Sequence, residues 1–288
     1  MDAEDNNSID FIKPLVSGLK AYDNFADLQH RLINFENSNV KIDFGWEGRL
    51  GRTYLFLIIS LFYLANQNDK KLKITVTKKI YDYLKEMKFI EEPKVNITPD
   101  GSLRFRRLSQ EEHTIAMAKD IVNNIPVKLS LKLHEDMVSR IGEMFNNARE
   151  HALAKHVLGC RYSKPGKKFC FACYDTGIGI VKSVLNYHNN ERLSDETALR
   201  WALAPYNSTA SKHNKPRGLG LDLLKQFSKA NKGEIRICTG NISYKYLGNT
   251  DVEQYKPLKN RFIGTLFEMD INAFDGKYAY GDERNDNN

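Results

Sequence analysis

Residues 169–179 read FCFACYDTGIG, and this stretch decides how the second half of the chain folds. Its first six residues are uncharged and mostly apolar, which predicts a buried strand that ends at Asp175. Gly177 and Gly179 follow, and glycine lets a backbone approach a flat ligand without a clash at Cβ. A carboxylate at this place can accept a hydrogen bond from an amine. A tight turn in which Asp175 bonds its own backbone is the structural alternative.

A long amphipathic helix is predicted before that strand, over residues 134–154. Ile141 and Phe145 lie on its apolar face, whereas Glu143 and Asn147, four residues apart, share a different face. A carboxylate beside an amide oxygen can orient a water molecule and bind a hard cation such as Mg²⁺. Two solvated surface residues would show the same spacing.

A second glycine motif, Arg217-Gly218-Leu219-Gly220, opens a predicted helix over residues 220–231. Backbone N–H groups at the start of a helix bind phosphate oxygens when glycine leaves them accessible. A helix-initiating turn is the alternative. The chain has no P-loop, because no glycine-rich stretch places a lysine and a hydroxyl residue at the required spacing.

The remaining elements of this half are a helix over residues 110–123 and strands over residues 233–239 and 261–271. Residues 180–217 are polar and are expected to be a long mobile segment, and residues 240–260 are expected to be a loose connection. Helices grouped against antiparallel strands predict an α+β sandwich.

The N-terminal third shows a different order of elements. A strand at residues 40–44, an apolar helix at 52–66, a strand at 72–77 and a short helix at 79–88 describe a small α/β unit. The turn-rich residues 93–101 are the candidate boundary. We therefore divide the chain into a small α/β unit at 1–105, a second domain at 106–275 and a polar tail at 276–288.

The three motifs, in this order, resemble the GHKL ATPase superfamily, which includes gyrase B subunits and histidine kinases. The resemblance covers about residues 110–274, and Gly264-Thr265 on the last strand matches a pair that the family often places beside adenine. It implies a Bergerat-type sandwich, in which helices lie on a mixed, mainly antiparallel sheet. The N-terminal element order resembles a STAS-type domain.

The resemblance also implies roles for particular residues. Glu143 would be the general base, Asn147 would bind the Mg²⁺ of Mg·ATP, and Asp175 would bind the adenine amine with help from Thr265. The glycines that shape the pocket or face the phosphates would be Gly177, Gly179, Gly218 and Gly220, with Leu219 between the last two. Residues 181–217 would form the ATP lid, with candidate γ-phosphate contacts at Ser208, Thr209, Lys212 and Arg217.

This resemblance implies a Mg²⁺-dependent ATPase that acts as a nucleotide-driven regulatory switch. The alternative is a serine/threonine protein kinase of the anti-sigma type, because residues 146–152 resemble those stand-alone kinases. A nucleotide-gated binding module is a third, non-enzymatic reading. The expected partners are ATP and a small STAS-like or sigma-like protein, or a second copy of the chain.

A two-component histidine kinase matches less well. Those kinases usually carry Asn at the position of Glu143, and they need a helical hairpin that bears the phosphorylated histidine. His30 is the nearest candidate, but a β-α-β-α pattern follows it. His151 lies two turns beyond Glu143 and could face the site, although a surface histidine would fit the same pattern.

Composition and charge limit the classes of ligand and the compartment that we expect for the protein. The chain has 288 residues, with 43 Lys+Arg against 36 Asp+Glu and a net charge of +7. This modest excess suits a polyanion such as a nucleotide, and nucleic acid is an unlikely partner because no long basic run occurs. The apolar run at residues 54–65 is shorter than the ~20 residues of a membrane span. We expect a cytoplasmic protein without membrane contact.

Two further motifs are interpreted as structural. Cys170 and Cys173 are three residues apart on a strand and therefore point to opposite faces, so we expect buried cysteines and no shared metal or disulfide. The Asp-Thr-Gly at Asp175 also occurs in aspartic proteases, but their chemistry needs two such carboxylates and this chain has one copy.

Overall fold

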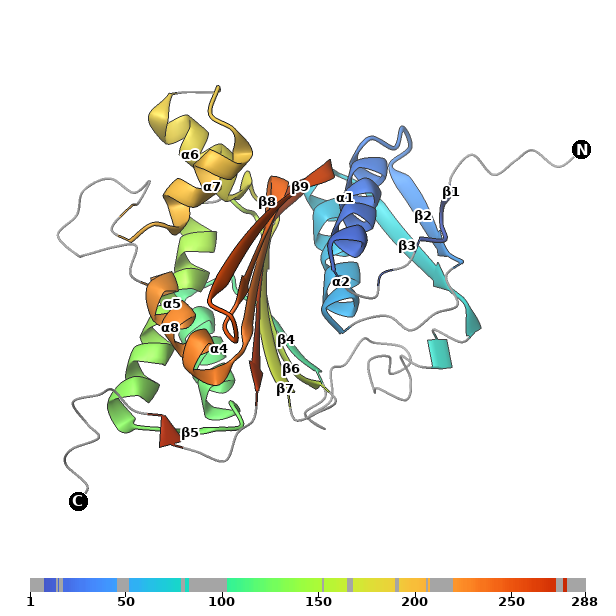
Figure 1. Cartoon of the computed structure of the whole chain (residues 1–288). Coiled ribbons are helices and arrows are strands. Elements are labelled where there is room, and N and C mark those ends of the chain that lie inside the picture. Colours follow the sequence, from blue (N-terminus) through green and yellow to red (C-terminus); the bar gives the residue numbers. More distant parts are fainter. Residues whose placement is uncertain are drawn as a thin grey trace, which may run out of the picture.

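The computed structural model describes residues 8–13, 15, 18–45, 52–78, 81–82, 103–151, 153–164, 168–189, 192–205, 207, 220–272 and 277–278. Among these residues the fold is α+β, with a parallel sheet in the order β1-β2-β3 and an antiparallel sheet in the order β4-β6-β7-β9-β8. Figure 1 shows four layers, with α4, α5 and α8 on one face of the antiparallel sheet and α1, α2 and the parallel sheet on the other.

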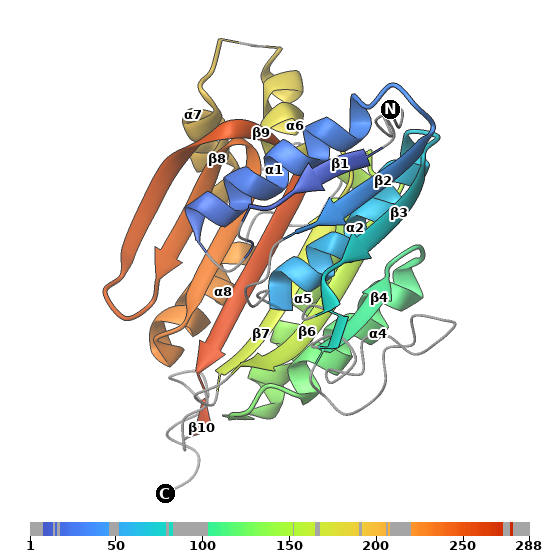
Figure 2. The same cartoon turned by 90° about the vertical axis from the view of Figure 1, so that its right-hand side faces the viewer.

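The N-terminal unit alternates strands and helices, so that parallel neighbours are joined by crossing helices. Its elements are β1 (Ser8–Phe11), α1 (Leu19–Ile33), β2 (Asn39–Phe44), α2 (Arg52–Gln67) and β3 (Lys71–Val76). Figure 2 shows the three strands side by side on the side that faces the viewer, with both helices between them and the antiparallel sheet. The predicted strands at 40–44 and 72–77 and the apolar helix at 52–66 are confirmed. Most of the expected helix at 79–88 and the whole break at 93–101 lie outside the described residues.

The antiparallel unit carries its helices on one face of the sheet. Its strands and the helices that cover them are β4 (Leu103–Arg107), α4 (Glu111–Asn123), α5 (Leu131–His151), β6 (Val157–Lys164), β7 (Lys168–Asp175), α8 (Gly220–Asn231), β8 (Glu234–Leu247) and β9 (Val252–Asn272), and a short pair joins β5 (Lys128–Leu129) to β10 (Lys277–Tyr278). The helices predicted at 110–123 and 220–231 and the strand at 169–174 are confirmed. β4 spans the boundary placed between residues 105 and 106, and β6 was not predicted.

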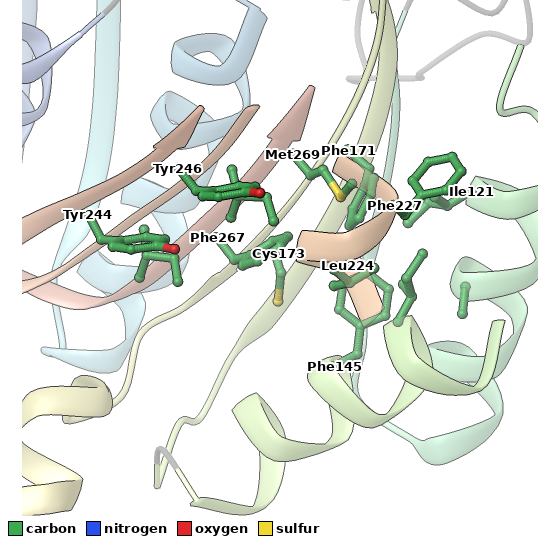
Figure 3. Close-up of a cluster of buried hydrophobic side chains, with 14 of the residues drawn as sticks. Ile121, Phe145, Phe171, Cys173, Leu224, Phe227, Tyr244, Tyr246, Phe267 and Met269 are labelled. Atoms are coloured by element: carbon green, nitrogen blue, oxygen red, sulfur yellow. The ribbon is translucent and has the colours of Figure 1, made fainter. Parts of the chain in front are cut away.

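The core of this unit lies between the sheet and its helices (Figure 3). Phe145 of α5 and Leu224 of α8 meet Phe171 and Phe267 from the sheet, and all four side chains are buried. The rings of Phe171 and Phe267 are 5.9 Å apart between centroids. Burial of each such aromatic or leucine side chain contributes roughly 1.5–3 kcal/mol.

Two expectations for the second half are wrong. Residues 240–260 are no loose connection, because β8 and β9 continue through them as one hairpin that bends at Gly240, where φ is 55° and the register shifts. Ile242, Tyr244 and Tyr246 alternate inward there and join the core of the helix-covered face. This burial of alternate side chains, together with the β8–β9 pairing, makes the hairpin ordered.

The segment 180–217 also contains regular structure where a long mobile stretch was expected. α6 (Gly179–His188) and α7 (Asp195–Leu203) stand at one end of the sheet (Figure 1). Val181 with Leu185, and Ala198 with Leu199, bury the apolar sides of these helices. Helical spacing of small apolar groups within a polar sequence is therefore enough to order them.

The N-terminal unit docks on the sheet face that α4, α5 and α8 leave open. α1 packs along β9, and α2 packs on β6 and β7. Phe25 of α1 lies against Phe262 of β9, with 5.9 Å between ring centroids. Tyr22 and Thr53 also reach across this interface and donate hydrogen bonds to the buried carboxylate of Glu268, at 3.2 and 2.9 Å. In the described part of the chain, no helix is both long and apolar enough to cross a membrane.

Candidate functional site

Asp175 ends β7 directly opposite Thr265 of β9, so two of the predicted site residues face each other across a strand pair. The carboxylate of Asp175 is buried, and its Oδ1 accepts a hydrogen bond from the Gly177 N–H at 2.8 Å. The Ile180 N–H, at the start of α6, donates to Thr265 Oγ1 at 3.1 Å. The structure therefore brings Asp175, Gly177, Gly179 and Thr265 together in one corner, which we call the Asp175 corner.

Glycine is required at two positions of this corner. Gly264 has φ of 79°, and a Cβ on it would overlap the backbone carbonyl of Asp175. Gly179 has φ of 78°, and a Cβ there would lie 2.6 Å from Thr239 Oγ1. L-residues rarely adopt this left-handed backbone, so any side chain at either position would be strained as well as crowded.

The Asp175 carboxyl titrates near neutrality. Burial raises its pKa to about 7, although the bonds from the Gly177 N–H and from Thr265 favour the ionised form and offset part of this effect. A carboxyl with such a pKa changes between donor and acceptor within the physiological range. Ionised, it would accept a hydrogen bond from an amine in a site from which water is largely excluded.

A cleft of about 570 Å³ opens beside the Asp175 corner, between α6 and the bend of β9. This volume lies in the range of small-molecule sites. Its walls are formed by the residues after β7, by α6, by the connection from α6 to the start of α7 and by part of β9. The lining residues are Gly177, Ile178, Lys182, Leu185, Leu193, Asp195, Arg261, Phe262, Ile263 and Gly264.

The sequence motifs did not predict the charged side chains of the cleft. Lys182 and Arg261 bring positive charge to it, and Asp195 Oδ2 accepts the Asn241 N–H at 2.6 Å beside the bend of β8. Lys182 could have been predicted, because it lies one turn after the Gly-Ile-Gly that opens a helix. Arg261 and Asp195 could not, because the bend that brings them there depends on long-range pairing.

Glu143 and Asn147 lie on α5, outside the lining of the cleft. They lie on the flank of α5 that faces away from α4, since Gly142 packs toward Ala118 and the Asn146 Oδ1 accepts the Thr114 hydroxyl at 2.9 Å. α8 contacts α5 and lies on its other side, over β8 and β9. Asn147 is exposed and Glu143 half-buried, and neither lines the cleft described above.

Glu143 is held in place on its helix. Its Oε2 forms an ion pair with Arg140 at 3.0 Å, one turn earlier. Gly220 is the first residue of α8, as expected for the end of the second glycine motif. The other predicted contacts in that motif and in the lid lie outside the described residues, namely Ser208, Thr209, Lys212, Arg217, Gly218 and Leu219.

One other group of side chains has the composition of a metal site. Cys170, Glu268 and Asp270 lie close together and are buried. However, the Arg236 guanidinium pairs with Glu268 Oε1 at 3.1 Å and with Asp270 Oδ2 at 2.8 Å, so both carboxylates already have a cation. The group is best explained as a buried ion-pair cluster beneath the N-terminal unit.

Cys170 and Cys173 behave as their spacing predicts. Cys170 belongs to the core beneath the N-terminal unit, and Cys173 to the core beneath α5 and α8, so the two thiols lie on opposite faces of the sheet. Both are buried and free. This confirms the prediction that the two cysteines are buried and point to opposite faces of the sheet.

Comparison of the sequence with models of known protein families gave no match, and comparison with curated proteins gave none either.

Proposed function

We propose that this protein binds ATP with Mg²⁺ and hydrolyses it as a nucleotide-driven regulatory switch. The observation that carries the proposal is the Asp175 corner: a buried carboxylate, close-packed glycines and Thr265 gather at one end of an antiparallel sheet, beside a cleft of suitable size. The order of the motifs around it supports the same reading.

The corner suits the purine end of a nucleotide. Ionised Asp175 would accept the exocyclic amine of adenine, and Gly177, which lines the cleft without a side chain, would let a flat ring approach. Lys182 and Arg261 give the cleft positive charge that would attract a polyphosphate. A neutral or cationic ligand would gain nothing from them.

The α5 flank suits the metal and the attacking water. Mg²⁺ usually takes one or two protein oxygens and completes its shell with water and phosphate oxygens, so the exposed amide of Asn147 is a fitting ligand. Bound Mg²⁺ would neutralise charge on the phosphates. Glu143, four residues earlier and oriented by Arg140, would accept the proton of the nucleophile.

Purified full-length protein with labelled ATP tests the proposal. We expect saturable Mg·ATP binding by calorimetry and release of labelled phosphate. Label on an added protein, with no free phosphate, would favour the protein kinase instead, and binding without turnover would favour a nucleotide-gated module. No heat on titration with ATP or ADP would overturn the proposal. Asp175→Asn should weaken ATP binding. Asp251→Asn, in the exposed turn between β8 and β9, is the matched control and should leave binding unchanged.

A further inference from the structure

Side chains of α1 bind the backbone of β9 where that strand no longer pairs with β7. The pairing of β9 with β7 ends at Thr265, and its register with β8 shifts between Phe262 and Pro257. In this interval, Asp23 Oδ1 accepts the Lys259 N–H at 2.7 Å, and His30 Nε2 lies 2.7 Å from the Arg261 carbonyl oxygen. The N-terminal unit thus supplies partners that neighbouring strands no longer supply.

Gln29 makes the closest of these connections to the cleft. Its buried side-chain amide accepts the Ile263 N–H and donates to the Ile263 carbonyl, each at 3.1 Å, and it also donates to the Tyr174 hydroxyl at 2.8 Å. Ile263 lines the cleft. One side chain of α1 therefore fixes both polar groups of a cleft-wall residue.

Gln67 makes the equivalent connection from α2 to the residue that directly follows β7. Its Nε2 donates to the Thr176 carbonyl at 3.1 Å, and its Oε1 accepts the Thr176 hydroxyl at 2.5 Å. Thr176 lies between Asp175 and the cleft residue Gly177. The two glutamines thus hold the end of β7 and the adjacent part of β9, which together form the Asp175 corner.

We infer that the N-terminal unit is a positioning element of the cleft, and that Gln29 and Gln67 couple its docking to occupancy of the cleft. Only the identity of the ligand rests on the proposed function. Because such coupling is reciprocal, a ligand in the cleft tightens the docking of α1 and α2, and a partner that pulls on the N-terminal unit loosens the cleft. Neither glutamine lines the cleft, so both act through the residues that they bind.

Hydrogen exchange on the full-length protein tests the coupling without any ligand. In both Gln67→Ala and Gln29→Ala we expect the amides of Gly177 and Ile180 to exchange about tenfold faster, because their local opening becomes easier. The Ile263 amide tests the coupling in Gln67→Ala alone, because Gln29→Ala removes its hydrogen-bond acceptor. Gln67 is only half-buried, so its variant keeps the fold even if the Gln29 variant does not.

Tyr22→Phe and Thr53→Val are the matched controls. Each removes a hydrogen bond across the same interface, but to Glu268, which does not line the cleft. These variants should leave exchange at Gly177, Ile180 and Ile263 unchanged. If the glutamine variants and the controls give the same exchange at these amides, the inference is overturned.

ATP titration of the same variants separates the two claims. Loss of coupling should weaken ATP binding about fivefold or more in the glutamine variants and leave it unchanged in the controls. If the wild-type protein binds no ATP but the exchange difference holds, the proposed ligand is wrong and the coupling stands. If ATP binds equally to all variants, the coupling is wrong and the proposed ligand stands.

Discussion

Gly264 and Asp175 are packed so tightly that a Cβ on the glycine would overlap the Asp175 carbonyl oxygen. A Cβ at this position would also lie 3.3 Å from Asp175 Oδ1. The backbone of β9 at Gly264 therefore packs directly against Asp175, whose carboxyl defines the corner. A shift of either residue would displace the other.

Replacing Gly264 tests this contact. We expect Gly264→Ala to lower the free energy of unfolding by about 2 kcal/mol or more, because the added carbon meets rigid backbone and the backbone angle is unfavourable. Urea denaturation measures the effect. Gly142→Ala is the control: its Cβ would meet only Ala118 Cβ at 3.9 Å, within a helix, and should leave stability equal or raised by about 1 kcal/mol. Equal losses in both variants would contradict the packing argument.

The pKa of Asp175 predicts how stability depends on pH. This carboxyl keeps its proton up to about pH 7 in the folded protein, whereas its ordinary pKa is 3.8. The folded state therefore holds more protons between these values, and the free energy of unfolding should fall as pH rises through them, by about 1.4 kcal/mol for each pKa unit of difference. In Asp175→Asn this contribution to the slope should vanish. An identical slope in the variant would show that Asp175 is not the group responsible.

Nucleotide affinity should follow the opposite trend. The ionised carboxylate is a stronger acceptor for the adenine amine than the protonated carboxyl, so ATP binding by the wild-type protein should strengthen from pH 6 to pH 8. Asp175→Asn should weaken binding at every pH and remove this dependence, as calorimetry at fixed ionic strength would show. Unchanged affinity in the variant would rule out the adenine contact.

Glu143 is predicted to serve turnover and not binding. Glu143→Ala should keep ATP affinity and lose about a hundredfold or more in phosphate release, the usual effect of removing a general base. Glu135→Ala, at an exposed position on the same helix, should change neither quantity. Hydrolysis at the wild-type rate by the Glu143 variant would remove this residue from the proposed role.

Arg236 is predicted to act as the structural cation of its cluster. Arg236→Met would leave Glu268 and Asp270 buried without their cation and should cost about 3–5 kcal/mol of stability, measured by denaturation. Arg200→Met removes an exposed arginine that pairs with Glu196 and should cost less than about 1 kcal/mol. A wild-type protein whose stability falls on treatment with a chelator would instead indicate a metal at this cluster.

Local patterns were sufficient for much of the fold. The helix at Gly220–Asn231 and the strand that ends at Asp175 follow from short-range periodicity, and the structure has both. The β8–β9 hairpin was missed although Ile242, Tyr244 and Tyr246 alternate in the sequence, because several polar residues around them suggested a loop. The alternation of these apolar side chains indicates a strand more strongly than the polar residues between them indicate a loop.

The arrangement of the two units could not be derived in the same way. Tyr22 and Glu268, which meet in the interface, are 246 residues apart in the chain. Nothing in the local sequence of α1 indicates that Gln29 binds the backbone of β9 and not water. The motifs therefore located the Asp175 corner, whereas the cleft beside it and the helices that support it required the assembled sheet.

Alkylation of the four buried thiols would report which part of the protein opens. Cys160, Cys170 and Cys238 lie in the core beneath the N-terminal unit, and Cys173 lies in the core beneath α5 and α8. An alkylating reagent followed by mass spectrometry therefore distinguishes two events. Release of the N-terminal unit should label the first three sites while Cys173 stays protected, whereas global unfolding should label all four at one rate.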